Sequence, residues 1–312
     1  DHGFLQDKRM NFQSLDLFMV SEESTRVAAM RAGEVDIAPA SLPSRKQVEA
    51  GGGRLVFAQE GVAVEVRWMG CWEPQHPCSD KRVRQALDYA IDKELIRDTL
   101  YGPEVFVVKG WVGVTPSAIG YTAALDPRPF DPDKARKLLV DAGFPGGKGF
   151  AKLIINTWGD TSSPFQVEGA QIVADSWRRE LGIEVEVVVG EETGIKKQWK
   201  AQQINGQVMW RDDEARRDAT AWTNSAYGNI KTKNRRHEDA ELLRVVEETV
   251  QIVDQDKREE AMTKLFPRLK DESYQLGMGY VNIPWAVGPR ISSWEPYPIS
   301  GWVTALHTIV WK

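Results

Sequence analysis

The densest group of ionisable side chains lies between two tryptophans, in WRDDEARRDATAW at residues 210–222. Its acidic run at 212–214 contains the residue types that act as general acid and base or ligate Ca²⁺. Arginines at positions 211, 216 and 217 neutralise these carboxylates and so disfavour a cation site. Two interpretations stay open: a solvated loop with internal ion pairs, or a ligand-binding segment, since loops after strands line crevices in α/β sheets.

A second group combines Cys71, His76 and Cys78 in CWEPQHPC. In an exported protein this spacing suits a small disulfide loop, and its two prolines bend the chain between the cysteines. The alternative is a metal site, but zinc sites need four ligands at tighter spacing and no second Cys/His cluster exists in the sequence. We therefore predict a disulfide between Cys71 and Cys78.

Several familiar catalytic motifs do not occur in the sequence. There is no G-x-S-x-G elbow and no H-E-x-x-H, and the four histidines are scattered. The glycine-rich segment 142–150 lacks the Ser or Thr of a phosphate loop and leads into a predicted strand. A net charge of −5 with dispersed basic residues argues against nucleic acid as a partner. Twelve tryptophans supply core packing or pocket walls suited to sugar rings, aromatic peptides or cations.

Hydrophobic periodicity predicts alternating strands and helices. Gly33, Gly102 and Gly143 serve as helix stops, Asp92 and Asp131 as N-caps, and Ser24 or Thr25 can cap the first helix. We expect strands at 10–20, 62–70, 151–158, 183–189, 206–210 and 274–282, and helices at 79–102, 131–144, 163–182, 237–253 and 255–273. Residues 103–130 are rich in Gly and Pro and look irregular. The element order predicts an α/β fold without internal repeats.

Three segments together resemble the extracellular solute-binding proteins, family 5, of peptide-type ABC transporters. The first is TRVAAMRAGEVDIAPA at 25–40. The second is DKRVRQALDYAIDKELIRDTLYG at 80–102, followed by FDPDKARKLLVDAGFPGG at 130–147. The third is the last pair of predicted helices with YQLGMGYVNIPWAVGPRISSWEP at 274–296. Matched in this order, they cover nearly the whole chain.

The resemblance implies a periplasmic binding protein-like II fold, in which two lobes of mixed sheets flanked by helices close on a ligand. Family members are considerably longer, so we expect this chain to start well inside the first lobe. Residues 1–104 and 283–312 would form the C-terminal part of the first lobe, and residues 105–282 the second lobe. The resemblance also implies a periplasmic or extracellular location, with membrane association through an N-terminal signal or lipid anchor, as in a lipoprotein, that this sequence lacks.

The same resemblance gives the charged stretch a role. Peptide-binding members end a strand in Trp, and an Asp three residues later pairs with the α-ammonium of the ligand. Trp210 and Asp213 hold this spacing, so Asp213 is expected to anchor a cationic or hydroxyl group. Trp210, Trp158 and Trp222 are expected to supply stacking walls, and Arg211 belongs to the same ligand-binding set. The EARRDA that follows Asp213 departs from the family pattern.

We therefore expect a non-enzymatic receptor that delivers a peptide or similar small solute to the permease subunits of an ABC importer by lobe closure. No cofactor and no nucleic acid are expected. The tryptophan content makes an oligosaccharide the alternative ligand. From another class of protein, a hydrolase or metal enzyme would use either the acidic run 212–214 or Cys71, His76 and Cys78.

Overall fold

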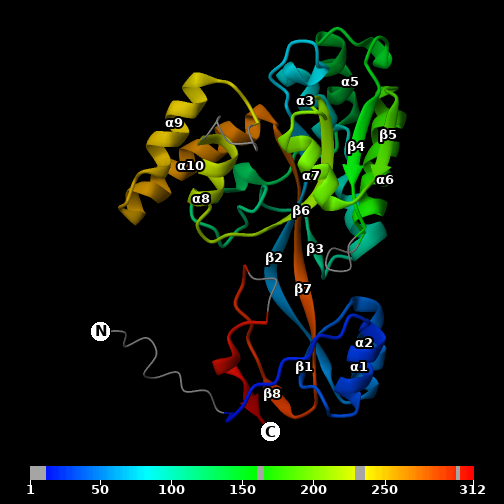
Figure 1. Cartoon of the computed structure of the whole chain (residues 1–312), viewed down its shortest axis with the longest axis vertical. Helices are drawn as coiled ribbons and strands as arrows, with labels where there is room; N and C mark the ends of the chain where they lie inside the picture. Colours follow the sequence, from blue (N-terminus) through cyan, green and yellow to red (C-terminus); the bar gives the residue numbers. More distant parts are fainter. Residues whose placement is uncertain (1–11, 160–164, 229–235, 300–302) are drawn as a thin grey trace. The chain divides into compact units, whose positions relative to one another are not determined.

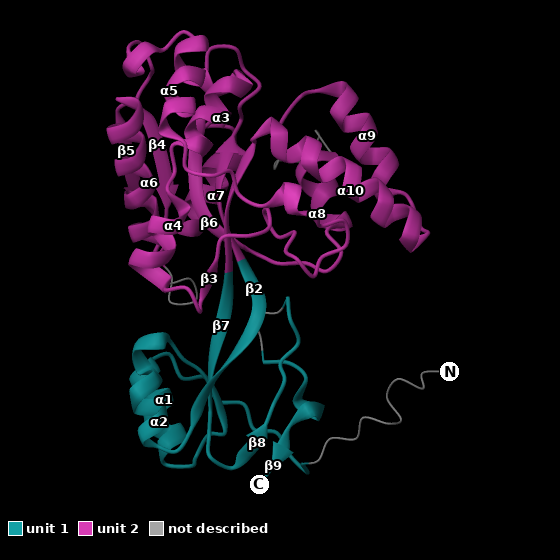
Figure 2. Ribbon diagram, turned by 180° about the vertical axis from the view of Figure 1, so that it is seen from behind, with its two compact units in different colours: residues 1–62, 281–312 teal, residues 63–280 magenta. Residues whose placement is uncertain are grey.

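The computed structural model describes residues 12–159, 165–228, 236–299 and 303–312. These form two compact units (Figure 2): unit 1 within residues 1–62 and 281–312, and unit 2 within residues 63–280. Strands β2 (Arg54–Met69) and β7 (Gln275–Val287) contribute residues to both units. Residues 63–104, which we expected in the first lobe, lie in unit 2. The assignment of residues to lobes stays a prediction.

Unit 1 is built on the second half of β7. Strand β1 (Ile37–Pro39) pairs antiparallel with it, Ile37 opposite Val287 and Pro39 opposite Trp285. Its other elements are α1 (Glu23–Arg31), η2 (Leu42–Ser44), α2 (Arg45–Ala50), β8 (Ile291–Ser293), η8 (Leu306–Thr308) and β9 (Val310–Trp311). One core cluster contains Ala58, Trp285, Val287, Ile291, Trp294 and Ile309.

Unit 2 contains a mixed sheet flanked by helices (Figure 1). The strand order in this part of the sheet is β7-β2-β6-β4-β5, and β3 (Phe106–Val107) also pairs with β7. Strand β4 (Leu153–Thr157) runs parallel to both β5 (Val185–Val189) and β6 (Gln207–Glu214). A parallel pair needs a long crossover, which the helix between β4 and β5 supplies.

The α- and π-helical segments among the described residues of unit 2 are, in chain order, α3 (Lys81–Tyr89), α4 (Lys93–Ile96), η4 (Arg97–Tyr101), α5 (Pro132–Asp141), α6 (Gln166–Leu181), α7 (Glu192–Lys200), α8 (Thr220–Thr223), η7 (Asn224–Gly228), α9 (Ala240–Val250) and α10 (Gln255–Glu272). Short 3₁₀ turns are η3 (Pro77–Ser79), η5 (Ala123–Leu125) and η6 (Pro145–Gly147). No helix among the described residues is both long and apolar enough to cross a membrane.

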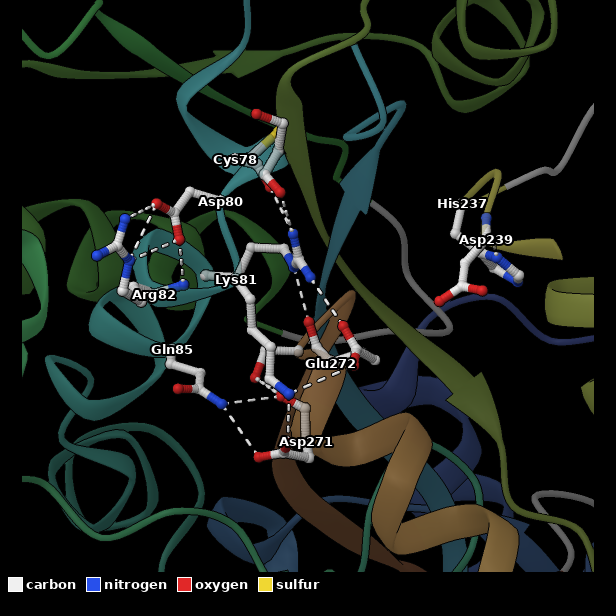
Figure 3. A network of polar contacts seen from close by, with 12 residues as sticks. Cys78, Asp80, Lys81, Arg82, Gln85, His237, Asp239, Asp271 and Glu272 are labelled. Carbon is white, nitrogen blue, oxygen red and sulfur yellow. Dashed lines mark hydrogen bonds and ion pairs between the residues drawn. The ribbon is translucent and has the colours of Figure 1, made fainter. Parts of the chain in front are cut away.

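Helix α3 joins two parts of unit 2. The Trp177 indole of α6 donates to the carbonyl oxygen of Leu87 in α3 at 2.8 Å. At the other side, Lys81 and Gln85 of α3 bind Asp271 at the end of α10 (Figure 3), with Gln85 Nε2 3.0 Å from the Asp271 carbonyl oxygen. These contacts explain why residues 81–89 belong to unit 2.

The capping signals define α5 and α4 as predicted. The Asp131 carboxylate accepts from the backbone N–H of Lys134 at 3.0 Å, and Pro132 is the first helical residue. The chain leaves α5 through Gly143 at a φ of 96°, where a side chain would be strained. Asp92 caps α4 by accepting from Leu95 N at 2.9 Å. Both N-cap predictions are confirmed.

Three element predictions are wrong. Residues 12–20 form no strand, because alternating apolar residues do not by themselves provide a partner strand. Ser24 and Thr25 lie inside α1, whose N-cap residue is Glu22. The strand predicted to end at Trp210 continues to Glu214, so the acidic run belongs to a strand and not to a loop.

Candidate functional site

Three neighbouring strands of unit 2 place ionisable and polar side chains close together. Strand β2 carries Glu65 and Arg67, β6 carries Arg211 and Asp213, and β7 carries Gln275. Residues two apart on a strand point to the same face, and β7, β2 and β6 are adjacent. With Arg216 and Arg236 from the following segments, they form what we call the arginine cluster.

Asp213 is bound by arginines on both carboxylate oxygens. Arg67 Nη2 donates to Asp213 Oδ2 at 2.9 Å, and Arg216 Nη2 donates to Asp213 Oδ1 at 3.2 Å. The backbone N–H of Glu214 also donates to Oδ1, at 3.0 Å. Burial raises the pKa of Asp213, but the positive charges of the surrounding arginines outweigh it and hold this pKa well below its usual range. Asp213 is therefore ionised and already paired.

Glu65 is the second acid of the cluster. It is fully buried, and it accepts hydrogen bonds from Arg67 Nη2 and from Gln275 Nε2. The amide oxygen of Gln275 in turn accepts from the Tyr227 hydroxyl at 2.6 Å, and the Gln275 backbone oxygen accepts from Trp111 Nε1 at 3.1 Å. These hydrogen bonds hold Glu65 in place as an ion-pair partner of Arg67.

Arg236 has no comparable partner. Only 3% of the residue is exposed, and its Nε and Nη1 have no hydrogen-bond partner among the described residues. Its guanidinium lies 5.7 Å from the ring of Trp199 and 5.8 Å from the ring of Tyr227. Burial, with the charge of Arg67, lowers the pKa of Arg236 to about 9, so the side chain is still cationic at neutral pH.

The buried charges of the cluster do not balance. Arg67, Arg211 and Arg236 are three buried or nearly buried guanidiniums, while Glu65 and Asp213 are two carboxylates, so three minus two leaves one positive charge in excess. Partly exposed Arg216 adds to the positive side. Burial, followed by repulsion from Arg67, also lowers the pKa of Arg211. The charge excess of the cluster is therefore positive.

The predicted site residues divide between two faces of β6. Asp213 and Arg211 lie together in the cluster, with Arg211 Nη2 3.9 Å from Asp213 Oδ2. Trp210 points to the other face and is 1% exposed. Its indole packs against Gly169 of α6 so closely that a Cβ there would lie 2.3 Å from Trp210 Cζ2. The surroundings of Trp210 are those of a core residue.

The other two predicted tryptophans reach the cluster indirectly. Trp158 is buried with Met69, Ile195, Trp199, Ile204 and Met209. Trp222 makes edge-to-face contacts with Trp111 and Tyr227, each at 6.0 Å between ring centroids. Trp199 and Tyr227 are the two rings beside Arg236, so Trp158 and Trp222 pack with the rings that contact this arginine.

The sequence reading missed Glu65, Arg67, Trp199 and Arg236. A signal existed for the first two, since VAVEVRWMG puts Glu65 and Arg67 on the second face of a strand whose other face is apolar. Two charges on one face of an otherwise hydrophobic strand indicate either solvent or a partner charge. Arg236 follows no such pattern, and only its tertiary surroundings set it apart.

Cys71, His76 and Cys78, the residues considered for a metal enzyme, do not form a metal-binding group. Cys71 and Cys78 are joined by a disulfide with a Cα–Cα distance of 5.3 Å, so neither offers a thiolate. His76 Nε2 lies 3.0 Å from Glu73 Oε2, and a cavity of about 170 Å³ beside it is lined by residues that include Cys78 and Asn205. Within the described ranges, no three His, Cys, Asp or Glu side chains are grouped to hold a metal ion.

Asp212, in the acidic run, points away from Asp213. It accepts from Gln166 Nε2 of α6 at 3.0 Å, on the face of β6 that carries Trp210. The side chain of Glu214 is 73% exposed. The run 212–214 thus spreads its carboxylates over two strand faces and the solvent, and does not gather them for shared acid–base chemistry.

Comparison with curated proteins finds relatives that are much longer than this chain. Glutathione-binding protein GsiB of Salmonella typhimurium (strain LT2) is 27% identical over 145 residues, which are 46% of this chain and 28% of GsiB. GsiB of Pectobacterium atrosepticum is 31% identical over 129 residues, 41% of this chain and 24% of that protein. The matched part is thus about a quarter of the relatives' length.

Solved structures share the fold. The ABC transporter substrate-binding protein CtaP of Listeria monocytogenes has a TM-score of 0.78 and 19% identity, covering 94% of this chain and 59% of CtaP. DppA of Helicobacter pylori in complex with the peptide STSA has a TM-score of 0.70, with 21% identity over 94% of this chain and 56% of DppA. AppA of Bacillus subtilis with a nonapeptide has a TM-score of 0.71, 15% identity and coverages of 94% and 59%. The predicted periplasmic binding protein fold is confirmed.

A family model decides the relationship. The model of the bacterial extracellular solute-binding proteins, family 5 (middle), matches residues 4–229. This range includes two of the three segments that carried the resemblance, and all of β6. Since the match covers well over half of the sequence, the chain belongs to the bacterial extracellular solute-binding proteins of family 5.

Proposed function

We propose that this chain is part of a non-enzymatic receptor that binds a small solute outside the cytoplasm and delivers it to the permease subunits of an ABC importer. The observation that carries this proposal is the family match over residues 4–229. We further propose that units 1 and 2 belong to the two lobes of the receptor. A periplasmic or extracellular location follows from the family description.

The arginine cluster is the proposed solute-facing part of unit 2. It is buried, it has excess positive charge, and it lies on the side of β6 where Asp213 stands. Asp213 was expected to bind a cationic group of the ligand directly. Oδ1 already accepts from Arg216 and from the Glu214 N–H, so an ammonium group would have to share Oδ2 with Arg67, beside guanidiniums that repel it. We therefore give Asp213 a positioning role as well: it holds both guanidiniums in place.

The proposed solute is a peptide or a peptide-like acid. Relatives and fold neighbours carry names or titles that mention glutathione, the peptide STSA and a nonapeptide. The chemistry of the cluster supports the same class, because a buried group of guanidiniums gains most from an ionised ligand. An uncharged oligosaccharide would leave the excess positive charge of the cluster unbalanced, so it is the weaker candidate.

A thermal shift measurement on the full-length protein tests the proposal. Ligands that bind only the folded state raise stability by RT ln(1 + [L]/Kd), about 2.7 kcal/mol at a hundredfold excess over Kd. Pools of di- to pentapeptides should raise Tm saturably, and each peptide should be recovered unchanged. Recovery of cleaved peptide would favour an enzyme instead. A Tm that responds to no pool of peptides or oligosaccharides would contradict the receptor.

A further inference from the structure

We propose that Arg236, with Trp199 beside it, is the anchor for a carboxylate group of the solute. This inference rests on the proposed receptor function and deepens it, since it names the chemical group that the ligand must carry. Arg236 was absent from the residues that the sequence and the family pattern suggested. Its burial, its free donors and the charge around it carry the inference.

The first argument is the cost of the burial of Arg236. A guanidinium removed from water is costly unless its charge and its N–H groups are satisfied. Arg236 is almost completely buried, yet its Nε and Nη1 have no partner within the described residues. No carboxylate oxygen of those residues lies within ion-pair distance of it. A partner that arrives with the ligand resolves this imbalance.

The second argument is that the acids of the cluster are already used. Glu65 and Asp213 both bind Nη2 of Arg67, and Asp213 also binds Arg216. Glu65 is held further by Gln275, so it is not free to turn toward Arg236. Even Arg67 retains one unpartnered donor, its buried Nε. The negative charge that Arg236 needs therefore has to come from outside the cluster.

The third argument is the way in which Arg236 is held. Trp199 and Tyr227 lie within 6 Å of its guanidinium, and Trp199 lies 5.8 Å from that of Arg67. Aromatic rings attract a cation through their π-electrons and use none of its N–H donors. The two rings can thus fix the position of the guanidinium and leave its donors for a ligand. Trp158 shares a core cluster with Trp199, and Trp222 contacts the ring of Tyr227.

A carboxylate is the group that fits best. The cluster has an excess of one positive charge, which one ionised carboxylate balances. Planar guanidinium donors match the planar carboxylate and form charge-assisted hydrogen bonds with it. The C-terminus of a peptide and an acidic side chain share this chemistry. Hydroxyl groups of a neutral sugar would satisfy the donors but not the charge.

Titration calorimetry on the full-length protein tests the anchor with three probes. These are a tripeptide pool without acidic residues and with free C-termini, the same pool with amidated C-termini, and an amidated pool with one Asp or Glu. Wild type should bind the probes that carry a carboxylate at least tenfold more tightly than the neutral amidated pool. Which of the two acidic pools is preferred distinguishes a C-terminal from a side-chain carboxylate.

The matched variants are Arg236→Met and Arg84→Met, because both residues are buried arginines of unit 2. Arg236→Met should remove the preference for carboxylate probes and should keep the Tm of the free protein close to that of wild type or raise it. Unchanged carboxylate preference in Arg236→Met would overturn the inference. So would a fall in Tm as large as that of Arg84→Met, since Arg236 would then be a structural residue.

The same experiments distinguish failure of the carboxylate anchor from failure of the receptor proposal. If neutral amidated peptides or uncharged oligosaccharides bind as tightly as the carboxylate probes, and Arg236→Met binds them equally, the receptor stands and the carboxylate anchor falls. If wild type binds none of the peptides or oligosaccharides, the receptor proposal itself fails, and the anchor with it.

Discussion

Arg84 and Arg236 are both buried arginines of unit 2, with exposed fractions of 1% and 3%. Arg84 donates through every nitrogen: Nε to the Glu272 carbonyl oxygen at 2.7 Å, Nη1 to the Cys78 and Ser79 carbonyl oxygens at 2.7 and 3.1 Å, and Nη2 to the Glu272 carboxylate at 3.3 Å. Arg236 leaves Nε and Nη1 without partners among the described residues.

Burial alone does not distinguish a structural arginine from a ligand-binding one, whereas the hydrogen-bond partners do. Arg84 connects α3, the disulfide segment and the end of α10, since it binds Cys78 and Glu272, which are labelled in Figure 3. Its guanidinium also lies 4.1 Å from the ring of Tyr274, but its donors all bind backbone carbonyls and a carboxylate that the fold holds in place, so its role is structural. Arg236 contacts two aromatic rings and no acid of the described residues. This is the pattern that our proposal expects of a ligand-binding arginine.

The largest expected effect is on stability in Arg84→Met. Removal of a buried guanidinium that donates through every nitrogen costs about 3–5 kcal/mol of unfolding free energy, mainly because the backbone carbonyls of Cys78, Ser79 and Glu272 lose their donors. Urea denaturation of the full-length protein measures this loss. The control Arg244→Met breaks an exposed pair with Glu248 and should cost about 0–1 kcal/mol. Equal losses in the two variants would remove the structural role of Arg84.

Asp213→Ala should have the next largest effect. Its loss leaves Arg67 with Glu65 alone and removes the Asp213 ion pair of Arg216, so the cluster would hold two excess positive charges instead of one. We expect a loss of about 2–3 kcal/mol, below the range for a fully buried pair because Asp213 is partly exposed. Glu214→Ala, at the exposed neighbouring carboxylate, is the matched control for the denaturation experiment.

A purely ligand-facing role for Asp213 predicts a different result. Unfolding free energies of Asp213→Ala and wild type would then agree within about 0.5 kcal/mol, the usual size of a surface effect. In that case the arginines would be positioned by Glu65 and by packing alone.

The sequence predicted elements whose signals are local. Asp131 and Pro132 begin α5, Asp92 caps α4, and the period of the apolar residues gave the order of strands and helices. The strand predicted at 10–20 does not form over residues 12–20, because this segment of alternating apolar residues pairs with no other strand among the described residues. Local patterns therefore predicted the α/β class better than the limits of each element.

The site could be predicted only in part. Asp213 and Arg211 were found from one charged stretch, but their partner Arg67 lies 146 positions away from Asp213. That pairing also explains why β6 extends through the charged run: Arg67 on the adjacent strand neutralises Asp213, which allows a strand to carry charge where a loop was expected. Trp210 fitted the family spacing, but side chains alternate between the two faces of a strand, and Trp210 therefore points toward α6 and away from Asp213.

A smaller effect concerns pH and His237, the residue after Arg236. His237 Nε2 lies 3.0 Å from the Tyr227 carbonyl oxygen, and its Nδ1 accepts from Asp239 N at 3.2 Å, so the neutral ring suits both contacts. Burial lowers the pKa of His237 in the folded state, below the unfolded value of about 6.5. The unfolded chain then binds the extra proton first.

Stability from His237 is therefore complete above pH of about 6.5 and falls as the pH drops below it, by at most about 1.4 kcal/mol per pH unit. Unfolding free energies at pH 7.5, 6.5 and 5.5 should decrease less steeply in His237→Gln than in wild type. Identical slopes in His237→Gln and wild type would mean that His237 does not couple to folding.

The smallest expected change in stability belongs to Arg236→Met, and it is the sharpest test of the comparison. Methionine has a similar length and fills the space beside Trp199 and Tyr227 without bringing a charge. Because no acid of the described residues loses a partner, the unfolding free energy should stay within about 0.5 kcal/mol of wild type or rise by about 1 kcal/mol. The same denaturation experiment as for Arg84→Met gives both values. A loss above about 2 kcal/mol would make the two arginines equivalent, and burial without an acidic partner would then be no sign of a binding role.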